Sequence, residues 1–249
     1  MNRREPGHTP HTRAVVRFLR ARLSPEGYLG FHLTVGMLLI ILAFLSFYEI
    51  GEDYANGWLA QMDRNAAEFF HPLMTPALTR VVLAVTFFGS VGAVTTLSVI
   101  VGIVLILKRS LYRFAAFALT IAGGRILAVA LKYLFARARP APENPIVTYA
   151  SYAFPSGHTM GTTLLCGSLA IIGATAVNGF GKRAGFFLLA AVWVMVIGAS
   201  RIYLGAHYLT DVIGGMTAGI AWLALCWTAV ETLRRWRIRH HSFAGRGLN

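Results

Sequence analysis

The stretch Ser-Arg-Ile-Tyr-Leu-Gly-Ala-His-Tyr-Leu-Thr-Asp occupies residues 200–211 and lies between two long apolar runs. A charged side chain near the centre of a bilayer costs roughly 2.5–3.5 kcal/mol on insertion scales unless it is paired or faces water. Arg201, His207 and Asp211 therefore indicate a polar site between two membrane spans. The competing interpretation is a helix-end histidine that is paired with its neighbour for structural reasons only.

The spacing within this stretch predicts how its polar side chains cooperate. His207 and Asp211 are four residues apart, so on a helix they share a face and the carboxylate can accept the imidazole Nδ1–H. That hydrogen bond leaves Nε2 free to act. A turn at Gly205 would bring the guanidinium of Arg201 to the group that His207 attacks, and a guanidinium matches phosphate oxygens.

Composition indicates a membrane protein. The 249 residues are 56% hydrophobic and only 13% charged, with a mean hydropathy of +0.59, whereas about 25% of the residues in a soluble domain are charged. A net charge of +13 would favour nucleic-acid binding in a soluble chain, but here the basic residues cluster beside apolar runs. We therefore expect a lipid bilayer as the partner and no nucleic acid.

The apolar runs predict an all-α fold, a six-transmembrane helix bundle. The spans are expected at residues 29–48, 91–107, 114–135, 159–177, 186–199 and 209–230, with a short loop at 178–185. A short helix from Leu78 to Phe88 precedes the second span, because Gly89-Ser90 breaks the apolar run. Residues 54–76 are amphipathic and predict a short interfacial helix, which either guides a lipid or is a packed connector.

The basic residues predict the orientation of this domain, which we place at residues 24–233. Residues 1–23 form a basic N-terminal segment and residues 234–249 a basic tail. With six spans, the termini and the loops at 108–113 and 178–185 hold sixteen of the twenty-three Lys and Arg residues on one side. Because positive loops stay inside, both termini are expected in the cytoplasm, in a multi-pass protein of the inner (cytoplasmic) membrane.

This topology places three motifs together at the outer, periplasmic face. Lys132 and Arg139 lie at the outer end of the third span, and Pro155-Ser156-Gly157-His158 begins the fourth. The cationic side chains, with Arg201, suit a phosphate or its trigonal-bipyramidal transition state. Ser156 and Gly157 precede a helix N-terminus, where backbone N–H groups form an anion cradle. His207 is then a nucleophile candidate, and His158 is positioned to protonate the leaving oxygen.

These residues resemble the three-part signature of the type 2 phosphatidic acid phosphatase superfamily. The first part is Lys132, followed after six residues by Arg139-Pro140, and the second part is Pro155-Ser156-Gly157-His158. The third part is Ser200-Arg201, then five residues, His207, three residues and Asp211. All three parts match the signature without substitution and in order. The resemblance covers residues 111–225. It implies His207 as nucleophile, His158 as acid and Asp211 as orienting carboxylate. It also implies a phosphate site that comprises Lys132, Arg139, Ser156, Gly157 and Arg201.

The function expected from the residues and the resemblance is hydrolysis of a lipid phosphate or diphosphate through a phosphohistidine, without a metal or another cofactor. Undecaprenyl diphosphate, phosphatidylglycerophosphate and phosphatidic acid are the expected substrates. The alternatives are a lipid phosphotransferase and a lipid A phosphatase with the same site. A transporter or channel is disfavoured, because it would need charges in mid-span and only Arg125 comes close. The sequence does not predict an oligomeric state.

Overall fold

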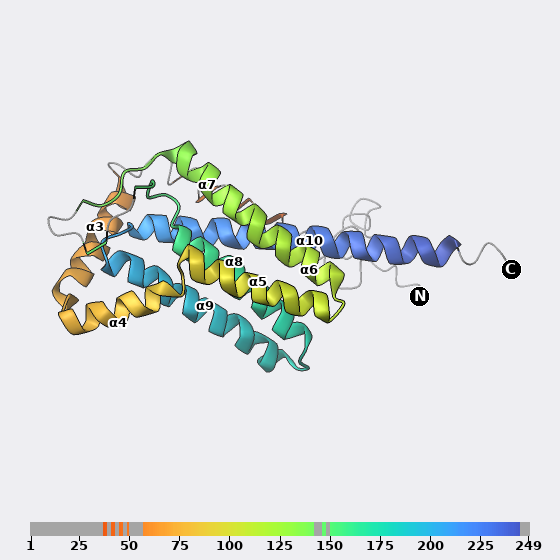
Figure 1. The fold of residues 1–249 in the computed structure, drawn as a ribbon. Coiled ribbons are helices and arrows are strands. Elements are labelled where there is room, and N and C mark those ends of the chain that lie inside the picture. Colours follow the sequence, from red (N-terminus) through yellow and green to blue (C-terminus); the bar gives the residue numbers. More distant parts are fainter. Residues whose placement is uncertain are drawn as a thin grey trace, which may run out of the picture.

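The computed structural model describes residues 57–141, 146–147 and 150–244, with residues 37–38, 41–42, 45–46 and 49. These residues form helices joined by turns and loops, and no strand occurs among them. From residue 57 onward, the helical elements form an elongated bundle (Figure 1). They are α3 (Trp58–Phe70), the 3-10 turn η1 (His71–Leu73), α4 (Pro76–Phe87), α5 (Val91–Leu107), α6 (Leu111–Ala118), the π turn η2 (Leu119–Gly123), α7 (Gly124–Phe135), α8 (Gly157–Thr175), α9 (Phe180–Tyr203) and α10 (Leu209–Ala244).

The predicted break in the long apolar run is confirmed. Helix α4 begins at Pro76, where a missing N–H costs nothing, and the hydroxyl of Thr75 accepts a hydrogen bond from the amide of Leu78. Helix α4 ends before Gly89, and α5 begins after Ser90, whose hydroxyl accepts from the amide of Ala93. A capping side chain thus restarts the helix after a turn, inside a sequence that is apolar throughout.

Four segments in the described part of the chain are long and apolar enough to cross a membrane: Pro76–Leu107, Leu111–Phe135, Phe180–Tyr203 and Leu209–Ile238. Together with its relatives, described below, they make the chain a multi-pass membrane protein. The predicted span at residues 29–48 lies almost wholly outside the described residues. The count of six spans therefore stays a prediction.

Helix α8 lies at the centre of the bundle, although it is not among those four segments. It packs against α5, α7, α9 and α10 (Figure 1). Its hydroxyl side chains at Thr159, Thr162, Thr163 and Ser168 are buried against these neighbours. Because protein rather than lipid surrounds α8, it does not need the hydropathy of the helices around it.

One predicted boundary is wrong. The loop expected at residues 178–185 is mostly helical, since α9 already begins at Phe180. The first part of the basic tail expected from residue 234 is helical, since α10 runs to Ala244, well beyond the rest of the bundle (Figure 1). In both places a helix continues past its apolar part into basic residues, which water can solvate without unwinding the backbone.

Helix α3 lies within the predicted amphipathic segment and covers one end of the bundle. It contacts α9 and α10, and it buries Leu59, Ala60 and Asp63 while Trp58 and Phe69 are exposed. This is the end at which α9 finishes and α10 begins (Figure 1). Residues 54–56 lie outside the described ranges. The observed contacts make α3 a packed part of the bundle, and its place at a membrane interface stays a prediction.

Candidate active site

Three hydrogen bonds to backbone carbonyls join the three predicted motifs at the end of the bundle where α9 finishes and α10 begins. Lys132 Nζ donates to the carbonyl of Pro155 at 2.9 Å, which ties the first motif to the second. Arg139 Nη1 donates to the carbonyl of Ala206 at 2.7 Å, which ties the first to the third. The amide of Ser156 donates to the carbonyl of Asp211 at 2.9 Å, which ties the second to the third. The predicted convergence of distant segments is therefore present.

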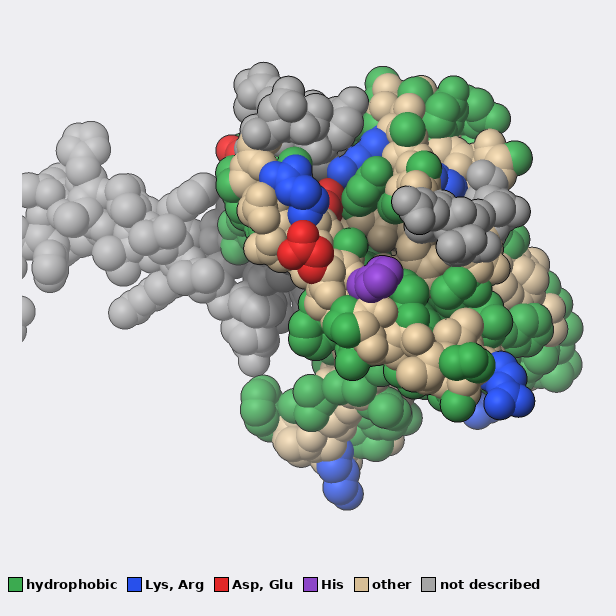
Figure 2. All heavy atoms as spheres, turned by 90° about the vertical axis from the view of Figure 1, so that its left-hand side faces the viewer, with side chains coloured by type: hydrophobic (Ala, Val, Ile, Leu, Met, Phe, Trp, Pro, Cys, Tyr) green, Lys and Arg blue, Asp and Glu red, His purple; other side chains and the backbone are tan. Residues whose placement is uncertain are grey.

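The surface of this end carries charges of both signs. Figure 2 looks onto it and shows Lys, Arg, Asp and Glu side chains gathered in its upper part, among hydrophobic side chains. The hydrophobic rim is what a membrane-embedded bundle exposes, because lipid tails cover apolar side chains without penalty. The charged part of this surface is the part that can take a charged headgroup.

The turn between α9 and α10 forms as predicted. Gly205 has φ of +62°, which favours glycine, and the chain reverses there between the last turn of α9 and the first turn of α10. Arg201 lies in the last turn of α9 and is fully buried, and its Nη1 donates to Thr86 Oγ1 at 3.0 Å. His207 follows in the turn, with only 3% of its surface exposed.

His207 is held at both ring nitrogens. Nδ1 lies 3.3 Å from Asp211 Oδ2, and Nε2 lies 3.2 Å from Arg139 Nη1. A carboxylate only accepts and a guanidinium only donates, so these partners select the tautomer with hydrogen on Nδ1. The Nε2 lone pair then accepts from Arg139, which places a cation beside the atom that would attack phosphorus.

The environment also keeps His207 neutral. Burial lowers the pKa of His207 to about 4, against the opposite effects of the hydrogen bond to Asp211 and of its charge. The charges of Arg139 and Arg201 act in the same direction as burial. At neutral pH the imidazole therefore retains the lone pair that a nucleophile needs.

The second motif begins helix α8. Ser156 is its N-cap residue and is fully buried; its hydroxyl accepts a hydrogen bond from Thr159 Oγ1 at 3.0 Å. Gly157 and His158 are the first two residues of the helix, where backbone N–H groups lack intrahelical partners. Helix α10 passes close beside them. A Cβ at Gly215 would lie 2.7 Å from the carbonyl oxygen of Ser156, so only glycine permits this approach.

The two cations of the first motif hold the segment that leads into α8. Lys132 Nζ donates to the carbonyl of Tyr152 at 2.6 Å, and Arg139 Nε donates to that of Ser151 at the same distance. These donors lie beside the second motif and beside His207, where a phosphate would compete for them. In the described part of the chain, no group of three or more His, Cys, Asp or Glu side chains is placed to hold a metal ion.

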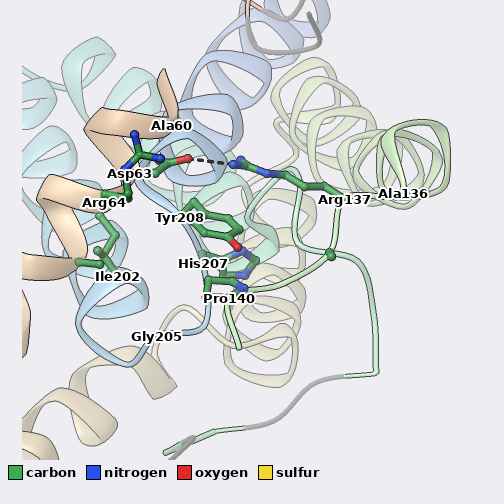
Figure 3. A pocket seen from close by; sticks show the side chains of 12 residues that line it. Ala60, Asp63, Arg64, Ala136, Arg137, Pro140, Ile202, Gly205, His207 and Tyr208 are labelled. Carbon is green, nitrogen blue, oxygen red and sulfur yellow. Dashed lines mark hydrogen bonds and ion pairs between the residues drawn. The ribbon is translucent and has the colours of Figure 1, made fainter. Parts of the chain in front are cut away.

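Sequence analysis missed two residues of this site, Asp63 and Arg137. Arg137 donates to Asp63 Oδ2 at 2.8 Å (Figure 3) and to Asp211 Oδ1 at 2.7 Å. Both carboxylate partners are buried. Asp63 lies four residues after Leu59 and three after Ala60, on the buried face of α3. The sequence did carry one signal for Asp63, because its carboxylate lies on the apolar face of an amphipathic helix.

A cavity of about 630 Å³ opens between α3, residues 136–140 and the turn that carries His207 (Figure 3). His207 and Tyr208 form part of its wall, and the other lining residues are Ala60, Asp63, Arg64, Ala67, Ala136, Arg137, Ala138, Pro140, Ile202 and Gly205. The imidazole is thus buried in the protein and still borders a space large enough for a small headgroup.

Comparisons with known proteins agree on one family. The sequence profile of the PAP2 superfamily matches residues 111–235. The chain is 29% identical to phosphatidylglycerophosphatase B of Bacillus subtilis over 163 residues, which is 65% of this chain and 80% of that protein. It is also 32% identical, over 84 residues, to lipid phosphate phosphatase delta of Arabidopsis thaliana, covering 33% of this chain and 20% of that protein.

Two solved structures share the fold. The crystal structure of a transmembrane PAP2-type phosphatidylglycerolphosphate phosphatase from Bacillus subtilis superposes with a TM-score of 0.68 at 26% identity, over 75% of this chain and 93% of that one. Aquifex aeolicus LpxE superposes with a TM-score of 0.52 at 22% identity, over 73% of this chain and 98% of that one.

Proposed function

The chain belongs to the PAP2 superfamily, and from this premise we propose that it is a membrane enzyme that hydrolyses a lipid phosphate through a phosphohistidine on His207. One observation carries the proposal. The buried imidazole has Asp211 at Nδ1 and Arg139 at Nε2, and it borders a cavity. This arrangement orients a neutral nucleophile and places positive charge where the phosphate oxygens would lie.

The first half of the reaction transfers the phosphoryl group to the protein. Nε2 of His207 attacks phosphorus, an N–P bond forms and the bond from phosphorus to the lipid oxygen breaks. Burial and the charge of Arg201 lower the pKa of His158 to about 3 without substrate, and the negative phosphate must raise it so that His158 can give a proton to that oxygen. The lipid then leaves as an alcohol or as a monophosphate. Asp211 keeps the Nδ1–H and stabilises the positive charge that develops on the ring.

The second half releases phosphate. Water attacks the phosphohistidine, now-neutral His158 takes a proton from that water, and the N–P bond breaks. Inorganic phosphate leaves and neutral His207 is restored. Lys132, Arg139 and Arg201 hold the equatorial oxygens through both steps, and the first N–H groups of α8, at Gly157 and His158, receive the remaining negative charge.

For the substrate, we propose a lipid phosphomonoester or diphosphate, with phosphatidylglycerophosphate tested first. The Bacillus subtilis relative and the Bacillus subtilis structure described above are both named for that lipid, and the comparisons cover 80% and 93% of their respective lengths. Phosphatidic acid and undecaprenyl diphosphate offer the same terminal phosphate and belong in the same test. Lipid A phosphate completes the panel.

Phosphate release from this panel by the purified, detergent-solubilised protein tests the proposal. We expect release to continue in excess EDTA, because the cations and helix N-terminus described above supply the charge stabilisation. We also expect vanadate to inhibit strongly, since it adopts the five-coordinate geometry of the transition state. Malachite-green detection of free phosphate measures both effects.

Two results would contradict this proposal. One is loss of activity in EDTA that magnesium restores, and the other is an absence of release from every lipid. An added lipid alcohol provides a further arm, since transfer to it in preference to water would identify a phosphotransferase instead.

We propose further that the site faces the outer side of the membrane with both termini inside. In a variant without Cys166 and Cys226, a cysteine at Ala141, which is exposed and follows Arg139, should react with a membrane-impermeant maleimide in intact spheroplasts. A cysteine at Gly181, at the start of α9, should react only after permeabilisation. Gel-shift labelling measures both.

The reverse pattern would place the site in the cytoplasm. Labelling of both positions from outside would contradict the six-span arrangement itself. Labelling of both positions after permeabilisation serves as the control that each cysteine is accessible.

A further inference from the structure

A buried chain of charges connects helix α3 to the nucleophile. Arg137 Nη2 donates to Asp63 Oδ2 at 2.8 Å, and Nη1 donates to Asp211 Oδ1 at 2.7 Å. The other oxygen of Asp211, Oδ2, faces His207 Nδ1 at 3.3 Å. The side chains of Asp63, Arg137 and Asp211 are at most 7% exposed. Water therefore screens these interactions little.

Asp63 also caps helix α10 from a different part of the chain. Its Oδ1 accepts from the amide of Thr210 at 2.8 Å, and its Oδ2 accepts from the Thr210 hydroxyl at 2.7 Å. The first N–H groups of a helix have no intrahelical partner, so a side-chain oxygen there fixes the helix start. His207 and Asp211, the proposed nucleophile and its carboxylate, lie three residues before and one residue after Thr210. The hydrogen bonds from Thr210 to Asp63 therefore tie the segment that carries them to α3.

Arg137 is fixed in its bridging position by further contacts. Its Nη1 also donates to Thr210 Oγ1 at 2.7 Å, and its guanidinium carbon lies 4.3 Å from the centroid of the Tyr208 ring (Figure 3). A planar guanidinium can bridge two carboxylates and stack on an aromatic face at once, which a lysine ammonium cannot do. One arm of the guanidinium thus holds Oδ1 of Asp211 while the other arm holds Asp63.

We infer that Asp63 and Arg137 are positioning residues for His207 that act through Asp211, an inference that rests on the function proposed above. The three charges of Asp63, Arg137 and Asp211 sum to one negative charge, which the imidazolium formed during phosphoryl transfer would balance. Without Asp63 the guanidinium would compete with the ring for Asp211. Without Arg137 two buried carboxylates would face each other across the site.

Asp63→Asn separates this role from helix capping. Asparagine still accepts from the Thr210 amide and caps nearly as well as aspartate, but its NH₂ group cannot accept from Arg137. We expect kcat to fall about 10- to 100-fold, as for groups that orient a reacting side chain, with KM within about threefold of wild type. Arg137→Lys, which keeps the charge and loses the bridge, should behave similarly.

The matched control is Glu68→Gln, which removes an exposed carboxylate from the same helix and should leave kcat unchanged. A double-mutant cycle that combines Asp63→Asn with Asp211→Asn provides the decisive comparison. Because Asp63 acts through Asp211, adding Asp63→Asn to that variant should lower kcat by less than about threefold. All rates are normalised to folded protein by size-exclusion chromatography and circular dichroism.

Either of two outcomes would overturn the inference. One is a kcat within about twofold of wild type in both single variants. The other is a loss confined to the amount of folded protein, which would make the network purely structural. A wild type that releases no phosphate from any lipid would instead contradict the proposed function, so the two failures are distinguishable.

Discussion

His207→Ala is expected to lower kcat by about 10⁴-fold or more, because it removes the group that forms the covalent bond to phosphorus. His158 is not expected to substitute, since it lies in the first turn of helix α8, whereas the turn before α10 places His207 against Asp211. The loss should appear in kcat with little change in KM. Initial rates of phosphate release across lipid concentrations give both parameters.

The control for this variant is His71→Ala, which removes an exposed histidine from the turn after α3. It should retain wild-type kcat. Residual turnover by His207→Ala above about one-hundredth of the wild-type rate would be too fast for a site without its nucleophile. That result would remove the covalent mechanism.

Asp211→Asn is expected to lower kcat by about 10³-fold, on the scale of other carboxylates that orient a catalytic histidine. The carboxylate accepts from Arg137 at Oδ1, and from the Tyr208 amide and His207 Nδ1 at Oδ2. An amide has one acceptor oxygen, so an NH₂ group must face one side. Facing His207, it would favour the tautomer with hydrogen on Nε2, which cannot attack.

Glu231→Gln, elsewhere on α10, is the matched control. Glu231 pairs with two arginines at the surface, where such pairs contribute little. Its kcat should equal that of wild type. An unchanged kcat in Asp211→Asn would assign Asp211 a structural role and would also remove the basis for the positioning role of Asp63.

Much of the fold follows from local signals in the sequence. The break between α4 and α5 lies where Gly89-Ser90 interrupts the apolar run, and the turn at Gly205 lies where the sequence predicts it. The meeting of the three motifs follows from topology, because alternate helix ends lie on one side of a bundle. Each of these features depends on residues that are close in sequence or on the order of the spans.

The parts that were not predicted depend on long-range pairing. Asp63 and Thr210 are 147 residues apart, and no periodicity links them. Arg137 resembles its neighbour Arg139 in sequence, and only packing makes one of them a bridge between carboxylates. The start of α9 was missed because Gly181 and Lys182 weaken an apolar pattern that the helix itself does not require.

The phosphohistidine on His207 is the central proposal, and rapid quenching tests it most directly. Wild-type protein is mixed with lipid labelled at the terminal phosphate with ³²P and quenched in alkali, under which phosphohistidine survives. Mass spectrometry then locates the label. We expect acid-labile phosphate on the peptide that contains His207, and we expect it to be absent from His207→Ala. Phosphate release by wild type with no label on His207 at any quench time, or with label on another residue, would contradict the mechanism.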